Sequence, residues 1–198
     1  FDNYNGFEEL RTASIYSISK DRKGKVWMAT TQGFYSFDPV RKQFTRRYWD
    51  GAEGKFYIPF NNIYHFHQDT LGIFWLATGG GGLIRLDTEP QLSEKYLEND
   101  LTKGGHFQQF TLADGLSSNV LYAVYEDDFS NLWISSDYGI IKFDKISEKP
   151  ITFLPKDGLP HYEFNRISHH QAKNGQLYFG GLNGVTTFHP GVFQSEAQ

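Results

Sequence analysis

One motif recurs four times along this chain of 198 residues. Its first copy, KGKVWMATTQGFYSFD, has a turn glycine, a tryptophan among small and apolar residues, a second glycine, and an alternating tail that ends in Phe-Asp. The aromatic position of the four copies is filled by Trp27, Trp75, Trp133 and Tyr178, which lie 48, 58 and 45 residues apart. A repeat of this length is typical of a propeller blade or a solenoid unit. A catalytic motif is not normally repeated four times in so short a chain, so the pattern predicts that these aromatic side chains are structural.

Each copy is predicted to contain four short strands. The first strand is apolar and aromatic, the second carries the Trp or Tyr, and the third alternates, as in GFYSFD. A weaker and more polar fourth strand follows three of the copies. Period-2 alternation favours strands, and four antiparallel strands per repeat are the blade of a β-propeller. We therefore predict an all-β fold: one β-propeller domain with four blades of four-stranded antiparallel sheet, over residues 12–49, 60–112, 118–156 and 164–192.

Turn residues punctuate every copy at the same places. The first two strands are joined by DRKG, DTLG, DDFS and AKNG. Asp can hydrogen-bond the turn backbone and Gly accepts a positive φ, so these segments read as tight turns. A second glycine, at Gly33, Gly139 and Gly184, precedes the third strand and is predicted to be structural as well; in the second copy Gly81 or Gly82 fills this place.

The two ends of the chain leave three arrangements open. Residues 1–5 resemble a fourth strand with no blade before it, and the last copy has no fourth strand of its own. The N-terminal segment could close the last blade of a small four-bladed ring. The same pattern would arise if a larger, seven-bladed propeller were cut between blades. A third arrangement is a homodimer, because an open blade edge invites pairing with a second copy.

Charge and composition argue against nucleic-acid binding, membrane binding and disulfide chemistry. The net charge is −4 and there is no basic run, so nucleic acid and anionic membrane surfaces are poor candidates. No apolar run approaches the roughly 18 residues of a membrane span. The chain has no cysteine, which excludes disulfides and thiol chemistry.

Catalytic and metal-binding patterns are weak, and we expect no cofactor and no catalytic residue. There is no G-x-S-x-G, and the glycine run at 79–82 lacks the Lys-Ser/Thr of a phosphate-binding P-loop. His67 and His170 fall in the same column of the first strands, which line the central channel of a propeller. They are weak candidates for a partial metal site, and polar side chains in a wet channel explain them better.

Propeller topology indicates where a ligand would lie. The loops between second and third strands share one face with the connections between blades. Residues that differ between the copies on this face are the better ligand candidates, and aromatic rings with amide and carboxylate groups suit sugars. The candidates are Gln32, Asp137, Tyr138, His161, Tyr162 and Asn183.

The repeat also resembles a known family. The pattern D-x-x-G-x-[VL]-W-[IML]-[AS]-[TS], followed by a glycine and a closing Phe/Leu-Asp, together with the DGL elements at 114–116 and 157–159, is similar to the two-component regulator propeller repeat. The resemblance covers about residues 12 to 192. Segment 163–190 looks like the closing blade of that family's sensor propeller. The sequence departs from the pattern at Ser130, Ala172 and Tyr178.

The resemblance implies a sensor. Proteins of this kind are typically hybrid histidine kinases with large propellers in the periplasm, a Y-Y-Y domain after the last blade, and a transmembrane helix and kinase core further on. Many are linked to polysaccharide fragments, so an oligosaccharide ligand is expected, with the remaining blades and the Y-Y-Y domain as partners in a parent chain. Two alternatives stay open: an enzyme of the streptogramin-lyase type, and a scaffold that binds protein.

Overall fold

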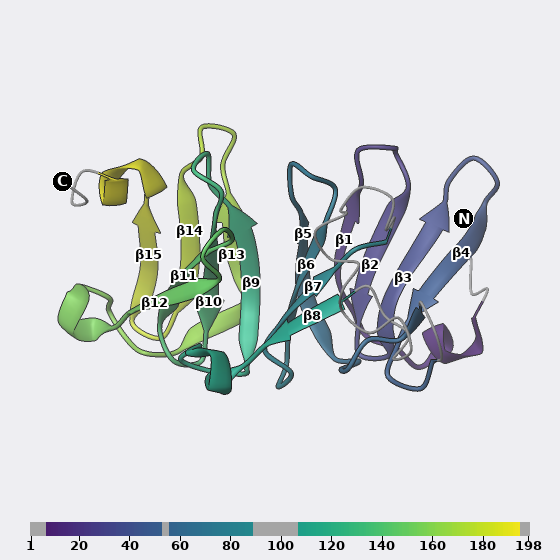
Figure 1. Cartoon of the computed structure of the whole chain (residues 1–198), viewed down its shortest axis with the longest axis horizontal. Helices are drawn as coiled ribbons and strands as arrows, with labels where there is room; N and C mark the ends of the chain where they lie inside the picture. The colour runs from purple at the N-terminus through teal and green to yellow at the C-terminus, as the bar shows by residue number, and fades with distance from the viewer. Residues whose placement is uncertain (1–6, 53–55, 89–106, 195–198) are drawn as a thin grey trace.

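The computed structural model describes residues 7–52, 56–88 and 107–194. They form four antiparallel sheets that follow one another along the chain (Figure 1). The sheets consist of β1 (Ile15–Lys20), β2 (Val26–Thr30), β3 (Gly33–Asp38) and β4 (Gln43–Tyr48); β5 (Ile63–Gln68), β6 (Phe74–Thr78), β7 (Leu83–Leu86) and β8 (Phe107–Phe110); β9 (Leu121–Glu126), β10 (Asn131–Ser136), β11 (Ile140–Asp144) and β12 (Lys149–Phe153); and β13 (Phe164–Gln171), β14 (Leu177–Gly181) and β15 (Gly184–Phe188). Short 3-10 turns follow as η1 (Glu8–Arg11), η6 (Leu112–Asp114), η7 (Pro155–Asp157) and η8 (Pro190–Gln194).

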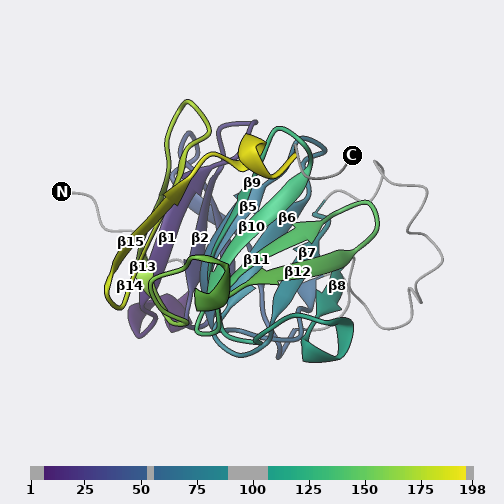
Figure 2. The same cartoon turned by 90° about the vertical axis from the view of Figure 1, so that its left-hand side faces the viewer.

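The predicted four strands are present in three of the four blades. The fourth sheet has only three strands in the part of the chain that the structure describes, with β15 at its edge (Figure 2). The outer strand proposed for residues 1–5 lies outside the described residues. Across the described ranges, no helix has the length and apolar character to cross a membrane.

The turn between the first two strands of a blade is organised by one aspartate. In the first blade, Oδ1 of Asp21 accepts the backbone N–H groups of Lys23 and Lys25, both at 2.9 Å. Its second oxygen accepts the indole N–H of Trp27 at 2.8 Å. The carboxylate therefore shapes the turn and also satisfies the one polar atom of a buried ring, as a buried indole N–H requires.

The same bonds recur in the second and third blades. The indole N–H of Trp75 donates to Asp69 at 2.9 Å, and that of Trp133 donates to Asp127 at 2.8 Å. In the fourth blade the sequence has Ala172 and Tyr178 instead. The two departures from the repeat thus concern the two partners of one hydrogen bond, which are lost together.

Each tryptophan packs against the next blade. Trp27, Trp75 and Trp133 are at most 2% exposed, and their rings lie 4.5, 5.8 and 4.7 Å from Phe74, Phe143 and Phe188 of the following blade, centroid to centroid. The buried apolar residues accordingly form three clusters, one between each pair of successive blades. Tyr178 has no following blade within the described residues and is 39% exposed.

Glycine before the third strand lets neighbouring backbones meet. Gly33, Gly82 and Gly139 have φ values of 116°, 75° and 91°, and a Cβ there would lie within 2.3 Å of a carbonyl oxygen of the fourth strand. Their N–H groups donate to the carbonyls of Asn61, Asn119 and Tyr162, at 3.0, 2.8 and 2.7 Å. These acceptors lie on the connections into the next blade, so a bond of this kind ties each of the first three blades to its successor.

Candidate ligand-binding site

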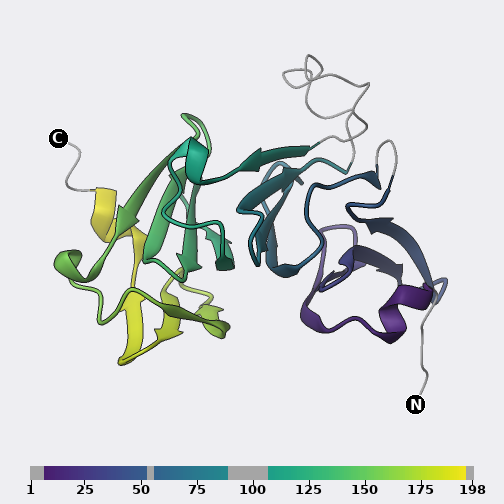
Figure 3. The same cartoon turned by 90° about the horizontal axis from the view of Figure 1, so that it is seen from below.

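The loops between second and third strands lie beside the residues that enter the first strands. The N–H groups of Thr31, Gly79, Asp137 and Leu182 donate to the carbonyls of Ser14, Asn62, Val120 and Glu163, at 2.8 to 3.4 Å. We call this side of the molecule the loop face. Turn η6 marks it at the lower edge of Figure 1, and Figure 3 looks onto it from below.

A β-bulge interrupts each first strand near the loop face. The pairing with the second strand shifts between Ile15 and Ser17, and again between Ile63 and His65, so Tyr16 and Tyr64 fall outside the ladder. The third blade has the same irregularity, which leaves Tyr122 unpaired. Bulges re-aim side chains and are frequent next to functional sites.

The irregular part is longer in the fourth blade. Pairing there resumes only at His169 after Phe164, and Arg166 lies in this stretch. The bulge position thus carries tyrosine in three blades and is replaced by an irregular segment with an arginine in the last.

These four side chains converge into what we call the Tyr–Arg cluster. The ring centroids of Tyr16 and Tyr64 are 5.1 Å apart with the rings nearly perpendicular, and those of Tyr64 and Tyr122 are 6.0 Å apart. The guanidinium carbon of Arg166 lies 5.0 Å from the Tyr16 ring centroid and 5.4 Å from that of Tyr64. The tyrosines are partly buried and Arg166 is exposed, so the cluster presents aromatic rings and one cation to solvent.

Polar groups border the cluster. The amide of Asn62 donates to the Tyr64 hydroxyl at 3.3 Å. Burial raises the pKa of Tyr122, and the carboxylates of Asp137 and Glu163 raise it further, which places both near that ring. Oδ1 of Asn62 and Oδ1 of Asp137 are buried and accept no hydrogen bond from the residues that the structure describes. Unsatisfied buried acceptors are costly, and a ligand hydroxyl can satisfy them.

Four of the six predicted ligand residues lie together on this face. The rings of Tyr138 and Tyr162 are stacked, with centroids 5.1 Å apart and planes 18° apart, and both side chains are more than 40% exposed. His161 packs edge-on against Tyr162 at 6.2 Å, and Asp137 precedes Tyr138. The stacked pair bridges the third blade and the connection into the fourth.

The structure gives the other two predicted residues backbone roles. The Gln32 carbonyl accepts hydrogen bonds from Arg47 and from the Tyr35 hydroxyl. Asn183 occupies the turn between β14 and β15 with φ of 68° and is exposed. Asn183 therefore serves the turn conformation, and Gln32 serves the first blade through its backbone carbonyl.

Two other histidines meet in the interior. The rings of His65 and His169 lie 4.6 Å apart. His65 Nδ1 accepts the Val124 N–H at 3.2 Å, and His169 Nδ1 is 2.8 Å from the Tyr125 hydroxyl. Burial holds the pKa of His65 well below its usual value and brings the pKa of His169 to about 4. Both are neutral at pH 7, and the Nδ1 atom of each is hydrogen-bonded to a residue of β9.

The metal candidates named from the sequence occupy separate surroundings. His67 Nε2 lies 3.4 Å from Glu126 Oε2, while His170 is exposed and stands 6.3 Å from the Tyr178 ring. No contact joins His67 to His170 among the described residues, and that same part of the chain holds no group of three metal-ligating side chains.

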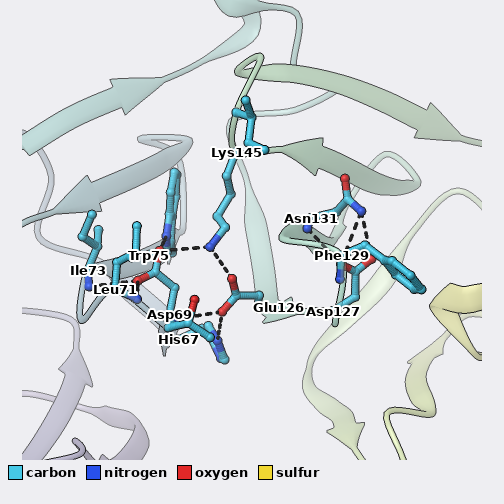
Figure 4. A network of polar contacts seen from close by, with 12 residues as sticks. His67, Asp69, Leu71, Ile73, Trp75, Glu126, Asp127, Phe129, Asn131 and Lys145 are labelled. Atoms are coloured by element: carbon cyan, nitrogen blue, oxygen red, sulfur yellow. Dashed lines mark hydrogen bonds and ion pairs between the residues drawn. The ribbon is translucent and has the colours of Figure 1, made fainter. Parts of the chain in front are cut away.

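His67 belongs to a buried ionic network between the second and third blades (Figure 4). Lys145 bonds to Glu126 and, at 3.1 Å, to Asp69; the three side chains are at most 9% exposed. Burial acts to raise the pKa of Glu126, but the hydrogen bonds from His67 and Lys145 outweigh it and bring that pKa to about 2. Glu126 is therefore an ion-pair partner, and its low pKa makes it a poor proton donor or acceptor near pH 7.

The Tyr–Arg cluster was not found from the sequence. A signal was present, since Tyr16, Tyr64 and Tyr122 each stand 11 residues before the Trp of their blade. Side chains that recur in register were assigned to the scaffold, and that reasoning fails for a position that leaves the ladder. Arg166 carries no such signal because the irregular stretch shifts the alignment of the last blade.

Comparisons with known proteins agree with this architecture. Residues 9–32 and 115–138 match the family model of the two-component regulator propeller. The chain is 26% identical over 214 aligned residues to histidine kinase P4 of Formosa agariphila, a match that covers 90% of the chain and 16% of that protein. It therefore spans about a sixth of the length of this relative.

Solved structures share the fold. The extracellular domain described for the hybrid two-component system BT3049 of B. thetaiotaomicron superposes with a TM-score of 0.69 at 25% identity, over 93% of this chain and 23% of that one. Virginiamycin B lyase of Staphylococcus aureus superposes with a TM-score of 0.59 at 12% identity, over 88% of this chain and 55% of the lyase. The likeness to the lyase concerns the fold alone.

Proposed function

We propose, from the two-component regulator propeller repeats that this chain carries, that it is a ligand-sensing segment of the periplasmic propeller of a two-component sensor. In this proposal the ligand is an oligosaccharide and the segment itself is not catalytic. The remaining blades, a Y-Y-Y domain and the histidine kinase belong to the parent protein, as in the family that the sequence resembles.

The observation that carries the proposal is the stacked pair of Tyr138 and Tyr162. Aromatic side chains are normally buried, but these two expose 47% and 43% of their surface on the loop face. Asp137 precedes Tyr138 in the chain, and its Oδ1 accepts no hydrogen bond from the described residues. Sugar rings stack their C–H faces on aromatic rings and need acceptors for their hydroxyls, which is what this arrangement offers.

The non-catalytic part of the proposal is supported by how the interior polar groups are engaged. His65 and His169 are partly buried and hydrogen-bonded, and Glu126 is held by Lys145 and His67. Each has a partner that stabilises its present protonation state, whereas general acid–base catalysis needs a group poised near the operating pH.

Isothermal titration of the chain with an oligosaccharide panel tests the proposal. Replacing both rings, Tyr138→Ala with Tyr162→Ala, is expected to weaken binding at least about tenfold, because each lost stacking contact is worth about 1 kcal/mol. Phe129→Ala is the matched control, since Phe129 is 49% exposed on a turn between first and second strands, away from the loop face. Unchanged affinity in the double variant would contradict the proposed site.

A further inference from the structure

Arg166 is held in an unusual way for an exposed arginine. It projects from the irregular part of β13 and lies over the Tyr16 and Tyr64 rings of the first two blades. An exposed arginine normally samples many rotamers, and stacking against two aromatic faces restricts that freedom.

The guanidinium has no acidic partner in the part of the chain that the structure describes. No ion pair or side-chain hydrogen bond of Arg166 occurs there, although Asp137 and Glu163 lie near the neighbouring Tyr122. Cation–π contact with the two rings does not use up the N–H donors of the guanidinium. A pre-oriented, unpaired guanidinium is suited to bind a planar or tetrahedral anion with two hydrogen bonds.

The cluster is bordered by charges of both signs. Arg166 contacts Tyr16 and Tyr64, and Arg166, Asp137 and Glu163 all lie near enough to Tyr122 to act on its pKa. The free acceptor oxygens of Asn62 and Asp137 can only bond to donors, such as hydroxyl groups. A fitting ligand therefore combines an anionic group with hydroxyl groups.

Gly79 lies against the polar groups of the Tyr–Arg cluster. A Cβ there would lie 2.6 Å from the Tyr64 hydroxyl and 2.6 Å from the Asn62 amide nitrogen. The absence of a side chain thus lets the tyrosine hydroxyl and the amide approach the loop backbone, next to the free Asn62 oxygen.

We infer that the Tyr–Arg cluster binds an acidic saccharide, with its carboxylate or sulfate group on Arg166, its ring on the tyrosine faces and its hydroxyls on Asn62 and Asp137. The inference rests on the proposed function and narrows it to one chemical class of ligand. The anionic group is shared by uronic acids and sulfated sugars, and the test separates the two.

The test compares matched sugars. The full chain is titrated with a glucuronate-containing disaccharide and its carboxyl-reduced glucose counterpart, and with a sulfated galactose oligomer and its desulfated form. We expect one acidic sugar to bind at least tenfold more tightly than its neutral partner, because charge-assisted hydrogen bonds are the stronger ones. The pair that shows the difference identifies the anionic group.

Variants assign the preference to Arg166. Arg166→Ala is expected to remove the preference, Arg166→Lys to keep part of it, and Arg41→Ala to leave it unchanged. Arg41 is the matched control because it is an exposed arginine on the turn between β3 and β4. Circular dichroism and the urea midpoint of each variant separate loss of binding from loss of folding.

Each outcome decides between the two proposals. Equal binding of both members of every pair, or a preference that survives Arg166→Ala, would overturn the inference and leave oligosaccharide sensing intact. Absence of binding to every sugar by the folded chain would overturn the proposed ligand class as well.

Discussion

At the scale of single residues, the Asp–Trp pair is the contact that defines a blade. Aspartate in the first turn was predicted from the sequence on turn chemistry alone, and the tryptophan on packing alone. The structure joins them, because the same carboxylate accepts turn N–H groups and the indole N–H of Trp27, Trp75 or Trp133. The link was missed because the partners lie six positions apart across a turn, and a repeat pattern says which residues recur without saying which of them touch.

Asp127→Ala tests this contact. The change leaves the N–H groups of Phe129 and Asn131 and the buried indole N–H of Trp133 without their acceptor. Since an unsatisfied buried donor costs about 1–3 kcal/mol, we expect the free energy of unfolding to fall by about 2–4 kcal/mol. Urea denaturation followed by Trp fluorescence measures it.

The neighbouring Asp128→Ala serves as control, because Asp128 is exposed. In addition, Asp127→Ala and Trp133→Phe should not be additive, as both remove the same bond. Strict additivity in that double-mutant cycle would show that the two residues stabilise the blade independently.

At the scale of elements, the strands and their order could be predicted from the sequence, while the bulges could not. Alternation and the recurring Trp and Gly positions locate three full sheets because each blade buries its faces in the same way. A bulge has no composition signal of its own; it depends on how the first strand meets the second. The Tyr–Arg cluster depends on these bulges and so escaped prediction, whereas Tyr138 and Tyr162 are ligand candidates from the sequence because they lie in loops that vary between copies.

The inner strands β5 and β13 give the chain a defined response to acid. His65 and His169 have folded-state pKa values below the ordinary value of 6.5, that of His169 being about 4. Between the folded-state pKa and the ordinary pKa of 6.5, these histidines bind protons in the unfolded chain but not in the folded chain. The contribution of these histidines to the free energy of unfolding should therefore have its full value above pH 6.5. It should fall as the pH is lowered towards 4, by up to about 1.4 kcal/mol per pH unit for each histidine.

Urea denaturation at a series of pH values measures this slope. His169→Gln should flatten it between pH 6.5 and 4, and His170→Gln, which changes an exposed side chain, should not. The carboxylate of Glu126, with a pKa of about 2, contributes at lower pH, from about 4.5 downwards. A slope that is the same in His169→Gln and in the unmodified chain would contradict the assignment.

At the scale of the whole molecule, the four blades are not equivalent. The first three are each covered by a following blade, while the fourth exposes an apolar face: Tyr178 is 39% exposed, Leu182 53% and Val185 64%. Its sheet also has three strands in the described part of the chain. The sequence shows that the last copy has no fourth strand of its own, and it leaves open whether residues 1–5, further blades or a second copy cover that edge.

Amide hydrogen exchange should reveal that the fourth blade is locally less stable than the third. Protection reflects local stability, which rises with buried apolar contacts. We expect the amides of β14 and β15 in the 198-residue chain to exchange at least tenfold faster than those of β10 and β11, whose sheet is packed on both faces. Mass spectrometry of peptic peptides resolves these segments, and uniform protection across the third and fourth blades would contradict the expectation.

The bulges in the first strands separate the residues that hold the sheet together from the residues that are available to contact a ligand. Tyr16, Tyr64 and Tyr122 stand outside the backbone ladder, and of the three only Tyr122 packs against one of the apolar clusters, so exchanging Tyr16 or Tyr64 leaves strand pairing and these clusters intact. Such positions can accumulate substitutions while the frame stays fixed. A propeller of this kind is therefore highly evolvable: new ligand preferences can arise one codon at a time, and the number of bulges sets how many independent recognition positions selection can act upon.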